Sequence, residues 1–305
     1  MNKKKMTGNL LLLIAAAAWG GGFIANNAAI RHIGVFTYET IRMGIGALML
    51  LPMAIASLSK EKKSAGFIPP SKKSKITLIV GGICCGVALV FASALQGFGL
   101  LHTTPGKGAF IAALYIVIVP LMTAFIQRKM PGLLIWIGVA VAVMGFALLS
   151  LSSGFGKINP GDLIMLGCAT VYSVQIYMLS VISPKVNVVA LACIEFFAAS
   201  ATASILALIL DDISLVTIGR AIIPLLYAGI ISGGIGFTLQ AVALKMTDSS
   251  VGSLIMSLES VFALLLSWMI TGERLLTREY VGCLLVFLAV ILSQLPEDKL
   301  KRKKT

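Results

Sequence analysis

Charge is the property that this sequence has least of. Charged residues make up 12% of the 305 positions, whereas soluble globular proteins carry about 25%. Hydrophobic residues make up 58% of the chain, which is more than a soluble core of this length can bury. The charges are also clustered, and the long apolar runs between them contain almost none. The composition therefore excludes a soluble domain and predicts a multi-spanning membrane protein.

Motifs for catalysis, metal binding and nucleotide binding are also missing. No GxxxxGK[ST] stretch occurs, so the chain has no ATP-binding P-loop of its own, and neither HExxH nor GxSxG occurs. The five cysteines form no CxxC pair and lie within apolar runs, so we interpret them as small core residues. The two histidines are far apart in the sequence. We therefore expect no metal site, no cofactor and no enzymatic activity.

Basic residues outnumber acidic ones and give a net charge of +13. In a soluble protein this excess would suggest nucleic acid as a partner. Here Lys and Arg lie in short segments between apolar runs, without interleaved aromatic residues. Anionic lipid headgroups and the positive-inside bias explain such segments better. The expected partners are thus membrane lipids and a small-molecule substrate, not nucleic acid.

Ten apolar runs are long enough to cross a hydrocarbon core of about 30 Å. We expect these spans at residues 8–30, 35–58, 76–99, 105–126, 132–152, 161–182, 187–210, 221–244, 249–271 and 279–295. The first run follows a signal-like MNKKK, but it continues to Ile30 and is interpreted as a spanning helix. With the N-terminus inside, 18 Lys and Arg residues fall on the inner side and six on the outer side. This bias predicts that both termini are cytoplasmic, in the cytoplasmic membrane of a prokaryote.

The two halves of the sequence resemble each other. Gly8–Trp19 matches Gly161–Tyr172 with an offset of 153, and Ala94–Gly108 matches Thr238–Gly252 with an offset of 144. Because each half has five spans, the second half enters the membrane from the opposite side. The sequence therefore predicts an all-α membrane protein built from two inverted five-helix repeats, at residues 1–157 and 158–305. Inverted repeats are common in secondary transporters.

Several short motifs carry a resemblance to a known family. They are Trp19-Gly20 in the first span, Arg42-Met43 in the second, and Gly272-Glu273-Arg274-Leu275 after the ninth, with Gly282 following. With the arrangement of five plus five spans, the whole chain resembles EamA-type transporters of the drug/metabolite transporter (DMT) superfamily. The first half departs from the pattern, because Arg128-Lys129-Met130-Pro131 stands where the second half has Gly-Glu-Arg-Leu. The resemblance implies transport of small metabolites, often amino acids, through a cavity lined by spans one, three, four, six, eight and nine.

Glu259 is the most unusual residue of the ninth span, because it lies near the middle of the bilayer. A carboxylate at this depth must be paired, hydrated or protonated. It is therefore a candidate for binding a substrate amine or a proton, and the alternative is a structural hydrogen bond to a neighbouring helix. Its repeat equivalent is Tyr115, also polar and near the midplane. Together they predict a shared wall of a cavity.

Lys107 stands near the start of the fourth span, after the N-cap candidate Thr104 and after Pro105. The exposed amides of a helix start attract anions, and Lys107 adds a full positive charge. The site is therefore a candidate for a substrate carboxylate, and the alternative is a lysine that reaches the lipid headgroups. With Glu259, it would hold the two charged ends of an amino acid or a related zwitterion.

Arg42 and Glu195 occupy equivalent positions in spans two and seven, and a buried ion pair between them is expected. One alternative is a local pair with Glu39, three residues before Arg42; another is substrate or proton binding. The other substrate-binding candidates are polar or aromatic residues of the expected cavity spans, with helix packing as the alternative. They are Gln96, Gln240, Trp19, Asn26, Tyr172 and Gln175.

Glycine and proline suggest how the spans pack. Gly82-x-x-x-Gly86 and Gly229-x-x-x-Gly233 lie at the same stage of spans three and eight. Small residues at this spacing favour close helix contact, and a hinge is the alternative. Pro120 predicts a kink in the fourth span, whereas the equivalent residue of the ninth span is Leu264. A kink is therefore expected in the first half only.

The sequence as a whole favours a secondary transporter that exports a small metabolite by alternating access. An amino acid or a related zwitterion is the best-fitting substrate, with proton coupling through Glu259 an open question. The protein is expected to be a monomer or a homodimer. A channel or scramblase-like facilitator is the first alternative. An intramembrane enzyme is the second, but the sequence offers no nucleophile–base arrangement or metal cluster for it.

Overall fold

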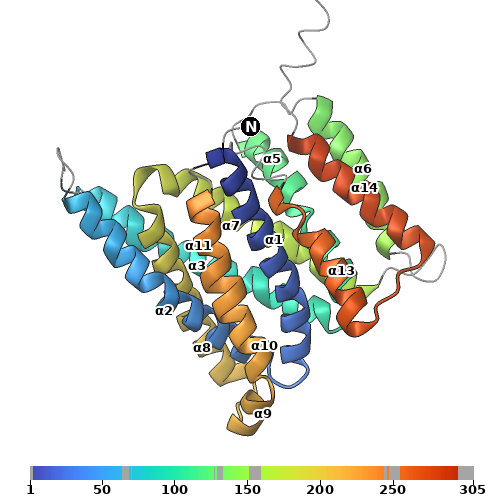
Figure 1. Cartoon of the computed structure of the whole chain (residues 1–305), viewed down its shortest axis with the longest axis horizontal. Helices are drawn as coiled ribbons and strands as arrows, with labels where there is room; N and C mark the ends of the chain where they lie inside the picture. Colours follow the sequence, from blue (N-terminus) through green and yellow to red (C-terminus); the bar gives the residue numbers. More distant parts are fainter. Residues whose placement is uncertain are drawn as a thin grey trace, which may run out of the picture.

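The computed structural model describes residues 3–63, 69, 71–126, 128, 133–150, 159–243, 246 and 255–294. Regular structure within these residues is helical throughout (Figure 1). The first half contains α1 (Lys3–Ile30), α2 (Val35–Lys62), α3 (Lys72–Leu100), α4 (Pro105–Ala112), α5 (Tyr115–Ile126) and α6 (Leu133–Ser150). The second half contains α7 (Pro160–Ile182), η1 (Ser183–Lys185), α8 (Val188–Leu210), α9 (Leu215–Arg220), α10 (Ile222–Leu226), η2 (Tyr227–Gly236), α11 (Phe237–Ala243), α13 (Glu259–Thr271) and α14 (Thr277–Gln294).

These helices follow the predicted spans in order. Within the described ranges, seven helical segments have the length and apolar composition to cross a membrane, and α6 and α13 contain shorter apolar stretches. The chain is thus an all-helical membrane protein with seven to ten candidate spans. The start of the ninth span, the predicted boundary at residues 157 and 158, and the basic C-terminal tail lie outside the described residues.

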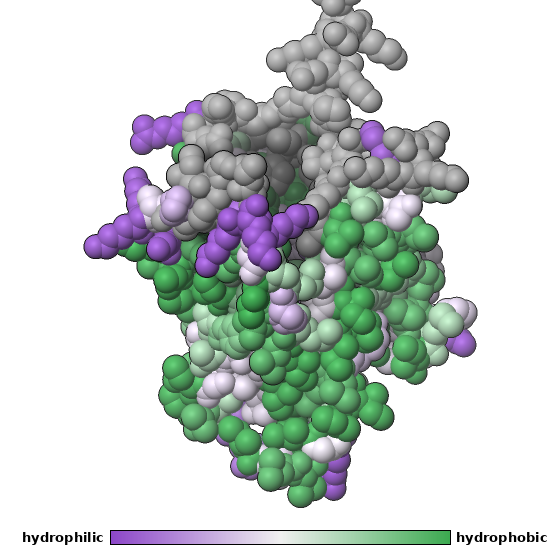
Figure 2. All heavy atoms as spheres, turned by 60° about the vertical axis from the view of Figure 1, so that its left-hand side comes forward, coloured by the Kyte–Doolittle hydropathy of each residue, from purple (hydrophilic) through white to green (hydrophobic). Residues whose placement is uncertain are grey.

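Apolar side chains cover the outside of the helix bundle. Phe125 and Leu208 are 85% and 77% exposed, which would be costly in water but suits contact with lipid tails. Figure 2 shows hydrophobic residues over the middle of the visible face, with hydrophilic residues gathered towards its upper and lower ends. The distribution agrees with a bilayer-spanning orientation of the bundle.

Several contacts that spans of the first half make with the second half have equivalents, in which the corresponding spans of the second half contact the first half. α3 packs on α7 and α8, while η2 of the eighth span packs on α1 and α2. α13 packs on α1, while α4 and α5 pack on α7. Equivalent spans also pair with each other, α2 with α8 and α6 with α14, and Figure 1 shows the second pair side by side. Two related halves packed about a common centre produce this pattern of exchanged partners.

Glycines lie at the closest helix crossings, as their spacing predicts. A methyl group on Gly86 of α3 would lie 2.5 Å from the backbone oxygen of Glu195 on α8. One on Gly229 of η2 would lie 2.7 Å from Cβ of Ile45 on α2. Since real side-chain atoms do not approach so closely, these positions admit only glycine without movement of the helices.

Spans four and nine are both interrupted, directly before equivalent residues. α4 ends at Ala112 and α5 begins at Tyr115, while turn residues 257 and 258 precede Glu259, the first residue of α13. At each break an amide bonds three residues back, from Leu114 to Ile111 and from Leu258 to Ile255, both at 3.1 Å. These breaks are separate from the kink predicted at Pro120, which lies within α5, and that prediction stays a prediction. A break without proline is tolerated here because the freed backbone lines a cavity rather than lipid.

The bundle has two distinct ends. At the first, which we call the α4 end, α1 and α3 finish and α2, α4 and α7 begin. At the second, which we call the basic end, α2 finishes with Lys60 and Lys62, and α3 begins with Lys72 and Lys73.

Candidate functional site

A cavity of about 700 Å³ lies inside the bundle and is lined by both halves. Its walls come from α1–α5 of the first half and from α7, α8, η2, α11 and α13 of the second, with Met256 and Ser257 just before α13. The family resemblance did not imply α2 and α8, the second and seventh spans, which contribute charged residues. Lining residues lie towards both ends of the bundle: Leu179 of α7 and Gln240 of α11 towards the basic end, and Asn26 of α1 and Tyr38 of α2 towards the α4 end.

The structure brings eight of the nine predicted substrate-binding residues to this cavity. They are Trp19, Asn26, Gln96, Tyr115, Tyr172, Gln175, Gln240 and Glu259. Arg42 and Glu195 line it as well. Lys107 does not belong to the lining, and its place is described below.

Glu259 stands at the cavity wall at the start of α13. Within the part of the chain that the structure describes, neither a hydrogen bond nor an ion pair reaches its carboxylate. The residues beside it are Ser257 and Ser260, which also line the cavity. Their first-half equivalents, at the offset of 144, are Ala113 and Ile116. The break in the second half is thus flanked by polar residues, whereas the equivalent residues at the break in the first half are apolar.

Two tyrosines connect this region to a polar network on the opposite wall. The rings of Tyr115 and Tyr172 are 6.4 Å apart between centroids. The Tyr172 hydroxyl lies 3.0 Å from Ser93 Oγ and donates to Gln96 Oε1 at 3.3 Å. Ser93 Oγ in turn accepts from Arg42 Nη2 at 3.1 Å. The Arg42 guanidinium and the Glu259 carboxylate therefore line the same cavity, together with the two tyrosines.

Arg42 pairs with Glu39 rather than with Glu195. Arg42 Nη2 lies 2.7 Å from Glu39 Oε2, and the Glu39 side chain is fully buried while that of Arg42 is 20% exposed. The expected pair with Glu195 is thus corrected in favour of the local alternative. One helical turn already holds Glu39 beside Arg42, so the pair needs no particular rotation of a second helix. Glu195 instead accepts a hydrogen bond of 2.5 Å from Gln175 Nε2.

The remaining predicted residues form a mixed apolar and polar wall. Trp19 Nε1 donates to the backbone oxygen of Ser232 at 3.0 Å. Ser232 belongs to the π-helical segment η2. Gln240 Nε2 lies 3.2 Å from the Met256 sulfur. Asn26 is buried, and its Oδ1 has no hydrogen-bond partner among the described residues, so this oxygen is available to a ligand.

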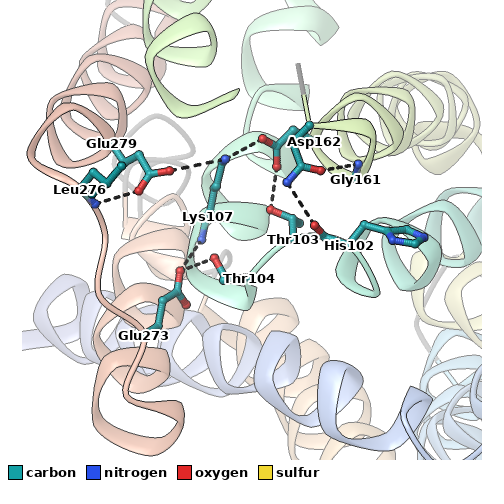
Figure 3. A network of polar contacts seen from close by, with 10 residues as sticks. His102, Thr103, Thr104, Lys107, Gly161, Asp162, Glu273, Leu276 and Glu279 are labelled. Carbon is teal, nitrogen blue, oxygen red and sulfur yellow. Dashed lines mark hydrogen bonds and ion pairs between the residues drawn. The ribbon is translucent and has the colours of Figure 1, made fainter. Parts of the chain in front are cut away.

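Lys107 lies beyond the cavity in a buried polar cluster at the α4 end (Figure 3). Its Nζ is 2.7 Å from Asp162 Oδ2 and 3.6 Å from Glu279 Oε1. The amides at the start of α4 are also occupied, because Glu273 accepts from Gly106 N at 3.0 Å and from Lys107 N at 3.3 Å. The prediction that Lys107 binds a substrate carboxylate is therefore corrected, since carboxylates of the chain itself fill the site.

Sequence reasoning missed the acidic members of this cluster. Asp162 and Glu279 each lie in the first turn of a helix, and Glu273 was noticed only within a family motif. A usable signal was present, because acidic residues are rare in this chain and each of the three lies within or directly after an expected outer loop. Which cation they meet depends on how the helices pack.

The chain matches known transporters over most of its length. Residues 6–151 and 159–295 each match the model of the EamA-like transporter family. A protein of Archaeoglobus fulgidus described as an uncharacterized transporter is 29% identical over 270 residues, which are 88% of this chain and 79% of that protein. A solved crystal structure matches with a TM-score of 0.61 and 18% identity, covering 98% of each chain. At that identity the likeness shows the fold alone.

Proposed function

The chain belongs to the EamA-like transporter family of the drug/metabolite transporter superfamily, and from this premise we propose its substrate class and mechanism. As a member of that family it is a multi-pass secondary transporter and not an enzyme. The proposed substrate is a small metabolite with an ammonium group, best an amino acid or a related zwitterion. The proposed route is alternating access through the central cavity, in the direction of export.

The observation that carries this proposal is that the Glu259 carboxylate has no hydrogen-bond or ion-pair partner among the described residues. Among the described residues of the cavity wall, the charged side chains are Arg42, Glu195 and Glu259. Glu39 balances the charge of Arg42, and Gln175 is the hydrogen-bond donor to Glu195. Glu259 is left without a partner, and an isolated charge in a low-dielectric site costs several kcal/mol. A bound ammonium group removes this cost, so a substrate amine is the natural partner.

Arg42 takes the role first assigned to Lys107. Its Nε and Nη2 bond to Glu39 and Ser93, whereas Nη1 has no hydrogen-bond partner among the described residues. The guanidinium lines the cavity and offers a directed donor to a carboxylate. A zwitterion held between Glu259 and Arg42 would contact Tyr115 and Tyr172, and we propose the other predicted lining residues as further contacts.

The proposed mechanism uses two inverted repeats, at residues 1–157 and 158–305, with both termini in the cytoplasm of a prokaryotic cell. The exchanged helix contacts support the repeat, and the excess of Lys and Arg supports the orientation. In this orientation the basic end is cytoplasmic, and the ion pairs of Lys107 join the helix starts at the opposite, outer end. Substrate would therefore enter from the cytoplasm, which favours export.

Ligand binding to the purified protein tests the substrate class. We expect amino acids or simple amines to raise the thermal unfolding temperature of the protein, because a ligand of the folded state stabilises it. Glu259→Gln should abolish this shift, whereas Glu61→Gln, at an exposed carboxylate of the basic end, should preserve it. Counterflow of a radiolabelled ligand in proteoliposomes would then separate a carrier from a channel. Unchanged affinity in Glu259→Gln would refute the proposal.

The same variant tests proton coupling. If Glu259 carries the proton as well as the amine, residual transport by Glu259→Gln should no longer respond to a pH gradient. A full response in this variant would exclude Glu259 as the coupling site.

A further inference from the structure

Three helix starts converge at the α4 end, and each holds a carboxylate. Glu273 accepts the first amides of α4, Asp162 lies in the first turn of α7, and Glu279 lies in the first turn of α14. Glu279 Oε2 also accepts from Leu276 N at 2.8 Å. The positive ends of the helix dipoles stabilise these anions. Lys107 supplies the cation between two of them, and Figure 3 shows its side chain pointing between Asp162 and Glu279.

The ion pairs of Lys107 join the two halves of the chain. Lys107 belongs to α4 of the first half, whereas Asp162 and Glu279 belong to the second half. The side chains of Lys107, Asp162 and Glu279 are 6%, 0% and 12% exposed, so water screens these charges little. Separation of α4 from α7 and α14 would have to break both pairs.

The cluster lies beyond the cavity wall at the α4 end. Ala109 and Ala112, the lining residues of α4, follow Lys107 by two and five positions along the same helix. Nearby, a methyl group on Gly161 would lie 2.7 Å from Cβ of His102, and Asn27 Nδ2 donates to Leu100 O at 2.8 Å. The helix ends are thus packed directly against one another at the α4 end.

The repeat shows that this cluster has no equivalent in the other half. The offset of 153 places Asn9 opposite Asp162, and the offset of 144 places Val251 opposite Lys107. The same offset places Ile135 opposite Glu279. Neutral residues therefore stand at all three equivalent positions.

We propose that Lys107, Asp162 and Glu279 form a latch that holds the cavity closed at the α4 end. The latch presupposes the alternating access proposed above. In the resting protein it favours the conformation whose cavity is accessible from the basic end. Opening at the α4 end hydrates all three charges, so the latch biases an equilibrium rather than forbidding one state. A coupling of this kind shifts populations by about tenfold.

Chemical accessibility of a cavity cysteine tests the latch without measuring transport. Ala112→Cys places a thiol on the α4 wall of the cavity, and a membrane-impermeant maleimide is applied to either side of oriented vesicles. The unsubstituted chain gives the background from the native cysteines. We expect modification of Ala112→Cys from the basic side. Adding Asp162→Asn should raise the rate from the α4 side about tenfold. The amide keeps the shape of the side chain and removes its charge.

Glu61→Gln is the matched control, because it neutralises a carboxylate at the basic end and should leave the rate from the α4 side unchanged. Glu279→Gln, at the longer pair, should give a smaller rise and serves as the test if Asp162→Asn does not fold. An unchanged rate in a folded variant overturns the latch. Modification of the parent Ala112→Cys protein from the α4 side as fast as from the basic side also overturns it. If amino acids and amines do not bind but Asp162→Asn still raises the modification rate from the α4 side, only the proposed function is refuted.

Discussion

Glu273 should be the most stabilising carboxylate at the α4 end. It accepts from Gly106 N at 3.0 Å and Lys107 N at 3.3 Å, and also from the hydroxyl groups of Thr104 and Ser267. The alanine substitution Glu273→Ala would leave two backbone amides of α4 without acceptors in a site where Glu273 is only 9% exposed. Ser267 Oγ keeps a neighbour, because Thr271 Oγ1 lies 3.1 Å away. The two amides therefore dominate the expected loss.

The size of the loss follows from these two bonds. A hydrogen bond to a charged group contributes about 1.5–3 kcal/mol, and removal of a helix N-cap acceptor costs about 0.5–2 kcal/mol. The two ranges describe the loss of the same amide bonds, so they are not added together. With about 1.5 kcal/mol for each of the two bonds, we expect Glu273→Ala to lower the free energy of unfolding by about 3 kcal/mol. Glu273→Gln keeps one carbonyl acceptor and should lose about half as much.

Reversible unfolding in mixed micelles, followed by far-ultraviolet circular dichroism, measures this difference. Glu61→Ala is the control, because Glu61 accepts one bond from Asn187 at an exposed site and its loss should cost less than about 1 kcal/mol. If Glu273→Ala is no more destabilising than Glu61→Ala, then Glu273 does not cap α4 as the structure indicates.

Two further substitutions test the packing and the cavity. Gly86→Ala should destabilise the protein by about 1–3 kcal/mol, because its methyl group meets the Glu195 backbone oxygen at 2.5 Å. Gly219→Ala, with no atom within 4 Å of its new methyl group, should be neutral or slightly stabilising, and thermal unfolding of both variants checks the difference. Tyr172→Phe removes the hydroxyl between Ser93 and Gln96 and should weaken ligand affinity about fivefold. Titration calorimetry measures that affinity, and an unchanged value would remove Tyr172 from the binding network.

The sequence predicted the spans and the depth of the cavity residues well, because a bilayer imposes both. Long apolar runs must be helices in hydrocarbon, and repeat offsets assign equivalent residues such as Tyr115 and Glu259 to equivalent depths. Both residues do line one cavity. The depth of each residue in the bilayer, read from its position along its span, was enough to predict the eight of the nine candidates that line the cavity.

Pairing could not be predicted in the same way, because it depends on the rotation of each helix about its axis. Arg42 and Glu195 are equivalent in sequence, yet Arg42 meets Glu39 and Glu195 meets Gln175. Lys107 was expected to meet either a substrate or lipid headgroups, and it meets Asp162. The breaks at residues 113–114 and 257–258 carry no proline or glycine that would have indicated them.

The chemistry of the protein differs between its halves more than its framework does. Both breaks have the same hydrogen bond of 3.1 Å, but one presents Tyr115 and the other presents Glu259. Both halves begin with a helix that carries a polar residue near its start, but one has Asn9 and the other has Asp162, which pairs with Lys107. If the two halves of a carrier were chemically identical, the conformation open to one side of the membrane would have the same free energy as the conformation open to the other side. We infer that Glu259 and Arg42 set what the cavity binds, and that Asp162, Glu279 and Lys107 set which end of it is open at rest.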